Sequence, residues 1–549
     1  MDALQRLVEA DAIGRLNGRD ASLYCEDFDA RIPIVQRMGW TDLASKATGR
    51  LPLLENLARA LAEEGADDLV LLGMGGSSLA PLVLSRVIGS SPRMPRLHAL
   101  DTTSPVAVRT LLDTLDATRT FFIVASKSGS TIEPLSLYAI FRQWMEAAMP
   151  RPAAGRRFIV ITDPGSPLEK LRQRELMRVT LSSPATVGGR YSALSMFGLA
   201  PAALIGVDLP TLIERAAVME DACKAPAEQN PGASLAAWII ERYEAQRDKL
   251  TIVCSPRLRS FGLWIEQLVA ESLGKEGKGI VPVVEQSTSI PTGYGDDRGV
   301  VVIRYSDDED LRTWSKAAAA DTPVFELVLT DSYDIGAEFL RWEYAIALAG
   351  FLMGVNPFDE PNVTEAKNAT TAILAGKATA PRASADVAGT WITYAGGLAA
   401  PDAPPADQVE ALRVALSSIK EGDYVALLAY LPEDESLIMP LRIAVKRLAD
   451  ATGVAVCFEL GPRYLHSTGQ LHKGGPNNGV FLMITTRDRT DFEIPKKDFR
   501  LAPLHRAQAE GDLATLAKHG CRVMRIDLPG LSQHEIGTLA DDITQAATS

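Results

Sequence analysis

The segment Ser126–Thr131 is the richest in side chains that could do chemistry, because it places four hydroxyl groups around one glycine. It follows residues 120–125, a β-branched and aromatic run typical of a buried strand, and it precedes an apolar stripe of helical spacing that begins at Ile132. Free N–H groups and the positive end of a helix dipole in such a turn favour an anion, typically phosphate. The alternative is an ordinary capped turn, but four hydroxyls exceed what a cap needs. We therefore predict an anion site made by Ser126, Lys127, Ser128, Ser130 and Thr131.

Arg190 is the second candidate, in the run Gly188-Gly189-Arg190-Tyr191-Ser192. An arginine on a flexible backbone that allows close approach can clamp an anion or stabilise a developing enolate. The alternative is a structural ion pair.

Glu271 is the third candidate, near the end of a helix predicted over 264–273. It falls at the edge of the apolar stripe of this helix, beside Trp264. A carboxylate half sheltered by apolar neighbours has a raised pKa and becomes a useful base. The alternative is a salt-bridged glutamate, because Lys275 and Lys278 are within reach.

A glycine-rich turn at 73–78 follows a strand predicted over 68–72 and opens a helix. Its backbone could approach a ligand closely at Gly76, and Ser77 offers a hydroxyl. The glycine spacing departs from that of a dinucleotide-binding turn.

Two of the six histidines, His466 and His472, lie in residues 465–475, which we predict to be a polar loop after a strand over 454–460. A histidine in such a loop is more plausibly exposed and functional than one on an apolar helix face. Neither a cysteine nor a carboxylate lies at metal-ligand spacing, so we expect no zinc or other metal.

Strands alternating with helices predict an α/β protein with mostly parallel sheets. We divide the chain into a helical segment over 1–47, a first α/β domain over 48–225, and a second domain over 226–549. The second domain continues as a C-terminal α/β portion after a linker near 399–406 that is rich in proline and alanine.

Composition excludes several classes of protein. The net charge of −13 and the lack of a basic cluster with aromatic residues argue against nucleic-acid binding. No apolar run is long enough to span a bilayer, and we recognise no secretory signal at the start. The five scattered cysteines favour reduced thiols in the cytoplasm.

Taken together, these segments resemble the glucose-6-phosphate isomerase family, which is built on two sugar-isomerase (SIS) domains. The resemblance runs from about residue 40 to the end of the chain, and its motifs are Gly73–Pro81, Ser126–Thr131, Gly188–Ser192, Glu271–Lys275 and the segment from Asn356 to Lys367. The runs 461–466 and 469–475 look most like the isomerase half of bifunctional transaldolase/glucose-6-phosphate isomerase proteins. The resemblance implies that the two domains are three-layer αβα sandwiches.

The resemblance also implies the chemistry, an aldose–ketose isomerisation through a cis-enediolate without cofactor or metal. Glu271 would move the proton and Arg190 would stabilise the enediolate. His466, with Lys367, would open the sugar ring. The hydroxyl-rich turn would hold the phosphate, while Gly76 and Ser77 would contact the sugar.

The sequence departs from the family at two points. The family's histidine precedes the lysine segment, whereas His466 follows Lys367, and His472 is a local alternative. The family usually has glutamine where Glu360 stands. A carboxylate near a phosphate dianion would repel it, unless Glu360 turns away or binds a sugar hydroxyl.

Two other functions stay open at this stage. One is an isomerase that also accepts mannose 6-phosphate, and the other is a non-catalytic sugar-phosphate sensor. The expected partner is the sugar phosphate itself, with neither nucleic acid nor membrane. The resemblance further implies a homodimer, in which the family's histidine is donated across the interface.

Overall fold

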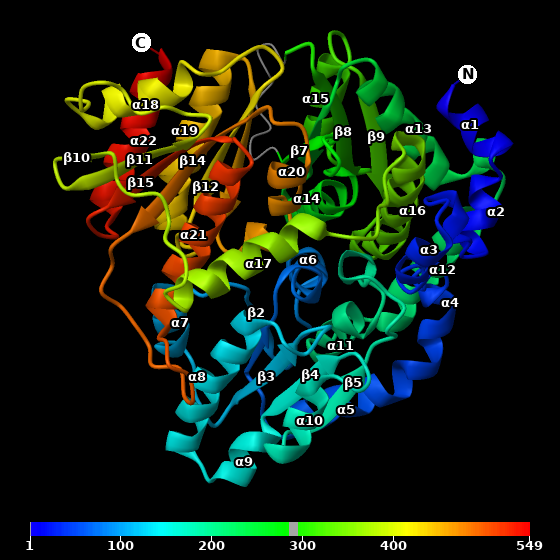
Figure 1. Ribbon diagram of the computed structural model, residues 1–549. Helices are drawn as coiled ribbons and strands as arrows, with labels where there is room; N and C mark the ends of the chain where they lie inside the picture. Colours follow the sequence, from blue (N-terminus) through cyan, green and yellow to red (C-terminus); the bar gives the residue numbers. More distant parts are fainter. Residues whose placement is uncertain (1, 285–294, 549) are drawn as a thin grey trace.

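The computed structural model describes residues 2–284 and 295–548 of the chain. In these residues the strands form three sheets that follow one another along the sequence, with helices packed around them (Figure 1). The first two sheets are wholly parallel and the third is mostly parallel, which confirms the predicted α/β class.

The first sheet has the strand order β2-β1-β3-β4-β5. Its strands are β1 (Asp68–Leu72), β2 (Arg96–Leu100), β3 (Thr120–Ala125), β4 (Phe158–Thr162) and β5 (Val179–Ser182). The helices of this region are α5 (Leu51–Glu63), α6 (Leu79–Val87), α7 (Pro105–Leu112), α8 (Ile132–Ala148), α9 (Arg151–Arg156), α10 (Pro167–Arg174) and α11 (Met196–Leu204). Strands β1 and β3 have the bounds that their apolar runs predict.

The strand order brings the glycine-rich turn and the hydroxyl-rich turn to the same end of this sheet, where the strands have their carboxyl ends. Strand β1 lies between β2 and β3, so the chain leaves β1 toward one side of the sheet and returns on the other with β3. Leu72 pairs with Val124, and the turns 73–78 and 126–131 therefore start from neighbouring strand ends. Open parallel sheets bind their ligands at the carboxyl ends of strands where the order reverses in this way.

The second sheet has the order β7-β6-β8-β9. Its strands are β6 (Lys249–Cys254), β7 (Val281–Val284), β8 (Arg298–Tyr305) and β9 (Val324–Leu329). The accompanying helices are α12 (Leu209–Ala222), α13 (Pro231–Glu244), α14 (Arg259–Leu273), α15 (Glu309–Ala318) and α16 (Ile335–Met353). Helix α14 packs on α6 as well as on α16, and thereby joins the first two sheets.

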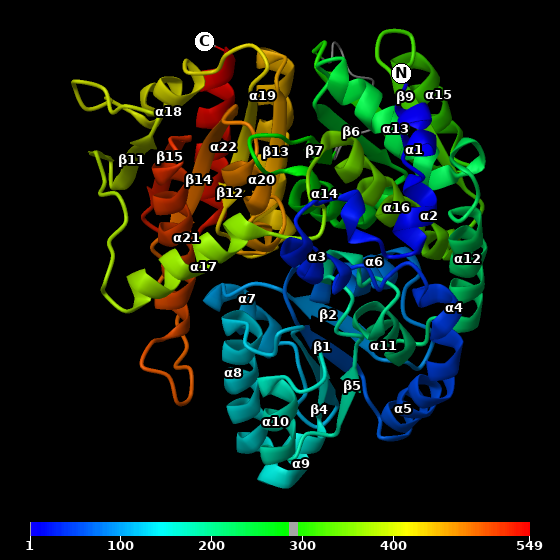
Figure 2. The same ribbon diagram turned by 45° about the vertical axis from the view of Figure 1, so that its right-hand side comes forward.

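The third sheet has the order β10-β11-β15-β14-β12-β13, with β11 antiparallel to both of its neighbours. Its strands are β10 (Ala385–Val387), β11 (Thr390–Gly396), β12 (Tyr424–Ala429), β13 (Ala455–Leu460), β14 (Gly479–Thr486) and β15 (Arg522–Leu528). The helices are α17 (Pro361–Leu374), α18 (Gln408–Leu416), α19 (Glu435–Thr452), α20 (Gly469–Gly474), α21 (Leu501–Lys518) and α22 (Gln533–Thr548). Helices α18, α19 and α22 cover one face, whereas α20 and α21 cover the other. Helix α17 packs along α21 (Figure 2).

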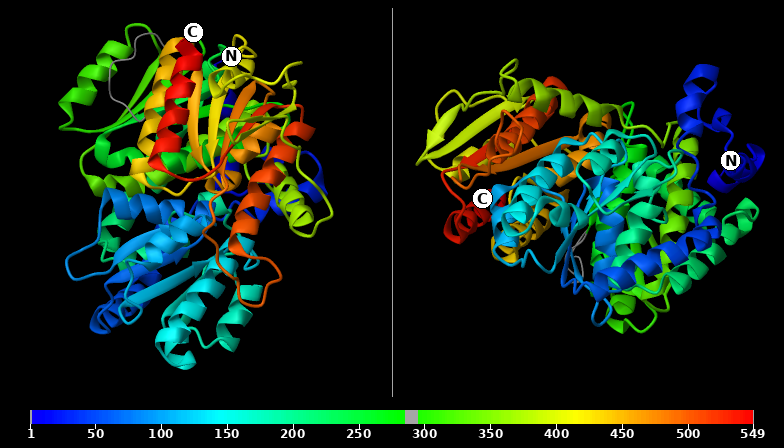
Figure 3. Two further views of the ribbon diagram at one scale, coloured as in Figure 1. Left: turned by 90° about the vertical axis from the view of Figure 1, so that its left-hand side faces the viewer. Right: turned by 90° about the horizontal axis from the view of Figure 1, so that it is seen from below.

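The N-terminal helices lie on the second sheet's side of the molecule, away from the third sheet (Figure 3). They are α1 (Ala3–Glu9), α2 (Ala12–Asn17), α3 (Phe28–Val35) and α4 (Leu43–Ala47). After α3, Trp40 stacks on Tyr191 with ring centroids 5.0 Å apart. The N-terminal segment therefore packs against the residue that follows Arg190 in the chain.

Candidate active site

Glu271 lies in the last turn of α14 and is almost fully buried. Its carboxylate accepts hydrogen bonds from Arg190 Nη1 at 3.2 Å and from Gln267 Nε2 at 3.4 Å. Burial raises the pKa of Glu271 to about 7, although the Arg190 charge acts to lower it. A carboxyl group with this pKa can take up and return a proton near neutral pH.

The lysine salt bridge that the sequence offered as an alternative for Glu271 is not formed. Lys275 Nζ donates instead to Asp359 Oδ1 at 2.8 Å, and Lys278 Nζ donates to the carbonyl of Met353 at 2.8 Å. The Glu271 carboxylate is therefore left to Arg190 and Gln267.

Arg190 is buried in the short 3₁₀ helix η4 (Gly189–Tyr191), and its guanidinium is held on all sides. It donates to Ser272 Oγ at 2.9 Å, Glu271 Oε2 at 3.2 Å, Glu360 Oε2 at 3.1 Å, the Pro357 carbonyl at 2.7 Å and the Asp359 carbonyl at 2.8 Å. Arg190 therefore makes the structural ion pairs that the sequence offered as the alternative, and these pairs fix a permanent positive charge beside the Glu271 carboxylate.

Glu360 is neutralised by two arginines. Besides Arg190, the Arg37 guanidinium lies 3.3 Å from the Glu360 carboxylate and donates to the Phe358 carbonyl at 2.5 Å. Burial alone would raise the pKa of Glu360, but the two guanidinium groups hold it below its ordinary value. A carboxylate compensated in this way repels a nearby phosphate much less than a free one would.

The histidine segment is not the polar loop that the sequence predicts. Residues 463–466 form the 3₁₀ helix η8, residues 469–474 form α20, and both histidines are buried. His472 Nδ1 lies 2.8 Å from the Tyr424 hydroxyl, and its Nε2 lies 3.0 Å from Glu459, so its ring is fully occupied within the third sheet's core. His466, by contrast, contacts a neighbour of Glu271, because its backbone carbonyl accepts a hydrogen bond from Gln267 Nε2.

His466 is paired with Glu133, a residue that sequence reasoning missed. His466 Nε2 lies 3.0 Å from Glu133 Oε1, which also accepts a hydrogen bond from Gln508 Nε2 at 2.8 Å. Burial would raise the pKa of Glu133, but His466 and Lys367 hold it below its usual value. The buried carboxylate fixes the orientation of the imidazole, as a general acid or base requires.

Gln267 connects the histidine to the glutamate. Its Nε2 donates to the carbonyl of His466 at 2.7 Å and lies 3.4 Å from Glu271. The glycine-rich turn closes the same region, because a Cβ at Gly75 would lie 2.9 Å from the His466 carbonyl oxygen. A Cβ at Gly76 would lie only 2.1 Å from the Gly189 carbonyl oxygen. Only glycine allows these backbones to approach so closely.

The hydroxyl-rich turn lies between β3 and α8 as predicted, and Gly129 has a positive φ of 67°. Ser126 Oγ is 2.9 Å from Thr131 Oγ1, while the exposed Ser128 and Ser130 hydroxyls are 3.0 Å apart. Lys127 is turned elsewhere, since its Nζ lies 2.5 Å from Asp163 Oδ2 and 3.0 Å from the carbonyl of Ala185. The exposed side chains at this turn are the Ser128 and Ser130 hydroxyls, whereas Lys127 is half-buried and paired with Asp163.

Lys367 lies on α17 with its side chain exposed. Its charge acts to lower the pKa of Glu133 and of Glu271, so its ammonium lies within electrostatic range of both carboxylates.

Ser77 is half-buried at the glycine-rich turn. The site thus gathers side chains from all three sheet regions.

Residues 2–284 and 295–548 contain neither a candidate metal centre nor a helix that could span a membrane. No three His, Cys, Asp or Glu side chains in these residues are grouped to hold a metal ion. None of the helices described there has the length and apolar character needed to cross a membrane.

Sequence reasoning missed Glu133, Gln267, Gln508 and Arg37. Glu133 and Gln267 carried a local signal, because one follows the hydroxyl-rich turn directly and the other lies one helical turn before Glu271. Gln508 and Arg37 carried none, since their partners lie hundreds of residues away in the sequence.

Comparison with known proteins places this site in a family. The phosphoglucose isomerase family model matches residues 59–296. A glucose-6-phosphate isomerase of Rubrobacter xylanophilus is 29% identical over 367 residues, covering 58% of this chain and 84% of the relative. One from Thermus thermophilus is 31% identical over 385 residues, covering 62% of this chain and 90% of the relative.

The chain belongs to the phosphoglucose isomerase family. A crystal structure of a hypothetical protein, also from Thermus thermophilus, is similar to this chain, at 27% identity and a TM-score of 0.59 over 68% of this chain and 97% of that one. The residues matched by the phosphoglucose isomerase model include the hydroxyl-rich turn, Arg190 and Glu271. They end before Glu360, Lys367 and His466.

Proposed function

We propose that the protein is a glucose-6-phosphate isomerase, which interconverts glucose 6-phosphate and fructose 6-phosphate through a cis-enediolate. The observation that carries the proposal is the buried Glu271 carboxyl group, with its pKa near neutrality and a fixed guanidinium beside it, in a chain of the phosphoglucose isomerase family.

In this proposal Glu271 moves the proton between the sugar's C2 and C1. The carboxylate takes the proton from one carbon and returns it to the adjacent carbon on the same face. Because Glu271 is held by Arg190 and Gln267, its position changes little between the two transfers. No cofactor is needed, because the isomerisation oxidises one carbon of the sugar and reduces the adjacent one, so that no electrons leave the substrate.

Arg190 would stabilise the negative charge of the enediolate. Its guanidinium is already fixed by Ser272, Pro357 and Asp359, so it needs no rearrangement as charge develops. Preorganised positive charge in a dry site is among the strongest means of lowering such a barrier.

His466, with Lys367, would transfer the protons that open the pyranose ring. The ionised Glu133 supports this role, because its hydrogen bond orients the imidazole. The exposed side chain of Lys367 on α17 lies within electrostatic range of Glu133 and Glu271. Its ammonium would act on the ring oxygen or the C1 hydroxyl.

The turn 126–131 would hold the phosphate with its hydroxyls and with the N–H groups at the start of α8. Lys127 would contribute a positive charge to the rim, partly cancelled by Asp163. Gly76 and Ser77 would contact the sugar, and Glu360 would accept a hydrogen bond from a sugar hydroxyl.

The assay that tests the proposal is conversion of fructose 6-phosphate to glucose 6-phosphate by purified protein, with mannose 6-phosphate alongside. Glu271→Gln should lower kcat by about 10²–10⁴-fold, the usual contribution of a general base. Its affinity for either sugar phosphate should be nearly unchanged, as measured by equilibrium dialysis. Equal losses of turnover and affinity would make Glu271 a structural residue instead.

The dependence of kcat on pH should show an ionisation near pH 7. Glu271 must be ionised to act as a base and its pKa is about 7, so kcat should fall as the pH drops below that value. Glu360→Gln provides a matched test, because the Glu360 charge helps to raise the pKa of Glu271. This variant should move the ionisation to lower pH. An unmoved profile would assign it to another group.

Ring opening can be tested apart from isomerisation. His466→Ala and Glu133→Gln should each lower kcat/KM for glucose 6-phosphate by about 10²-fold or more. Both should have far smaller effects on erythrose 4-phosphate, which has no free hydroxyl with which to close a stable ring. Equal losses on the two substrates would contradict a ring-opening role.

We also propose that the protein is a homodimer in which each site takes its histidine from its own chain. The His466–Glu133 and Gln267–His466 contacts within one chain support this arrangement. Mixing refolded Glu271→Gln and His466→Ala chains should then restore no activity in the dimer isolated by size exclusion. Sites shared across the interface would recover about a quarter of the normal activity, since half of the dimers would be mixed and each would hold one intact site.

A further inference from the structure

The third sheet has a strand reversal like the one at the Glu271 site. Strand β12 lies between β13 and β14, and the helices that follow β12 and β14 pack on opposite faces of the sheet. Helix α19 packs into the hydrophobic core on one face of the sheet, whereas α21 packs into the core on the opposite face. The carboxyl ends of two such strands form the crevice in which open parallel sheets bind ligands.

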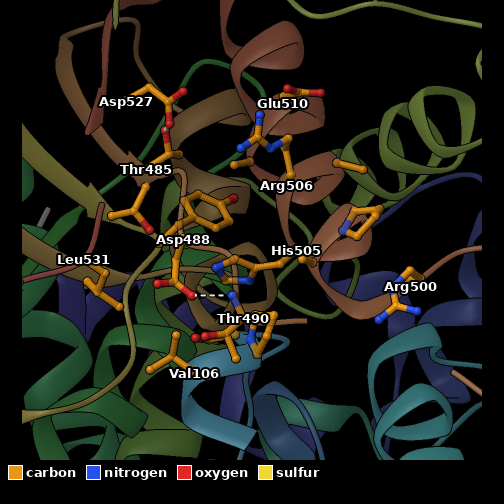
Figure 4. A pocket seen from close by; sticks show the side chains of 18 of the residues that line it. Val106, Thr485, Asp488, Thr490, Arg500, His505, Arg506, Glu510, Asp527 and Leu531 are labelled. Carbon is orange, nitrogen blue, oxygen red and sulfur yellow. Dashed lines mark hydrogen bonds between the residues drawn. The ribbon is translucent and has the colours of Figure 1, made fainter. Parts of the chain in front are cut away.

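A cavity of about 620 Å³ lies at this reversal. It is lined by Tyr430 and Pro432 after β12, by Thr485 and Thr486 at the end of β14, and by one side of α21 (Figure 4). This volume is in the range of small-molecule sites. None of the residues assigned to the isomerase lines it.

Two charged side chains of β15 reach this cavity with unused hydrogen-bonding atoms. Arg525 is 8% exposed, its Nε has no hydrogen-bond partner in the described part of the chain, and its closest carboxylate is Glu510 at 3.9 Å. Asp527 is 3% exposed, and its Oδ1 accepts from Thr485 at 2.7 Å. Its Oδ2 has no hydrogen-bond partner there and lies 3.9 Å from the Arg487 guanidinium. Buried polar atoms left in this state carry a free-energy cost, and both side chains also line the cavity.

The charged residues that line the cavity indicate what kind of ligand it could bind. Arg506 also lines it and lies one turn before Glu510 on α21, so Arg506 and Arg525 flank this carboxylate. Guanidinium groups of this kind bind a phosphate or carboxylate. Asp527 and Asp488 are acceptors that suit hydroxyl groups. A small molecule with one anionic group and several hydroxyls fits both requirements.

Helix α21 links this cavity to the catalytic histidine. His505 lines the cavity, and its Nδ1 lies 3.0 Å from Thr103 Oγ1. Thr103 donates to Gln508 Oε1 at 2.5 Å, and Gln508 donates to the Glu133 carboxylate that holds His466. A continuous set of hydrogen bonds therefore runs from His505 in the cavity wall to the Glu133–His466 pair.

We propose that this cavity is a second binding site, for a phosphorylated sugar, and that its occupancy alters catalysis through α21. The phosphate would bind Arg525 and Arg506 with the Glu510 carboxylate turned away from it, and the sugar hydroxyls would bind Asp527 and Thr485. The binding site stands independently of the function proposed above, whereas the effect on catalysis rests on it.

Binding is tested by equilibrium dialysis of labelled glucose 6-phosphate in the Glu271→Gln background, in which turnover is slowed. We expect two molecules bound per chain, and one when Ser128→Ala and Thr131→Ala are added, because these changes weaken the phosphate-binding turn of the first site. Arg525→Gln should remove one of the two. The matched control is Arg489→Gln, an exposed arginine outside the cavity lining, which should leave two.

A single bound molecule per chain in the Glu271→Gln protein would overturn the second site. So would a stoichiometry that Arg525→Gln does not change. Neither result depends on activity, so the failure of this proposal is distinct from failure of the isomerase assay.

Coupling is tested by a double-mutant cycle on kcat. At substrate concentrations that fill both sites, Arg525→Gln should change the isomerisation rate by about threefold or more, within the usual range of coupling between sites. Thr103→Val interrupts the hydrogen bonds between His505 and Gln508, so it should abolish this effect while leaving two molecules bound. A rate change that persists in Thr103→Val, or no change in either background, would overturn the coupling.

Discussion

The buried guanidinium of Arg190 is the interaction on which the rest of the site depends. An arginine does not lose its charge when buried, so the protein must surround it with acceptors. Those acceptors come from the end of α14 and from the carbonyls that precede α17. The hydrogen bonds that surround this one guanidinium therefore fix the position of Glu271, and its charge limits how far burial raises the pKa of Glu271. They also fix where α17, the helix that carries Lys367, begins. The N-terminal segment contributes to the same balance, because Arg37 neutralises Glu360.

Features with a local cause could be predicted from the sequence. Strands β1 and β3 are apolar runs bounded by turn residues, and the hydroxyl-rich turn and Glu271 lie within short recognisable motifs. The Glu133–His466 pair could not be predicted, because its members are 333 residues apart and neither has a neighbour in sequence that indicates the other. The family resemblance named His466 but did not supply its partner.

The histidine segment shows why polar composition misleads. Residues 465–475 resemble a solvated loop by composition, yet Lys473 and Asp512 form a fully buried ion pair of 2.6 Å there. Asp512 also accepts a hydrogen bond from Tyr464 at 2.7 Å. Removing one member of such a pair costs about 3–5 kcal/mol, because a charge is left buried without a partner. This partner lies on α21, so the burial of the segment depends on tertiary structure alone.

The position of His466 within its own chain has a consequence for how the enzyme would behave at low concentration. Where a site is completed by a neighbouring subunit, specific activity falls when the protein is diluted enough for the subunits to separate. Here the third sheet and α21 bring the histidine to Glu133 within a single polypeptide. Each chain would then carry a complete set of proton-transfer groups from the moment it folds. Its specific activity would follow folding rather than assembly, whatever the abundance of the protein in the cell.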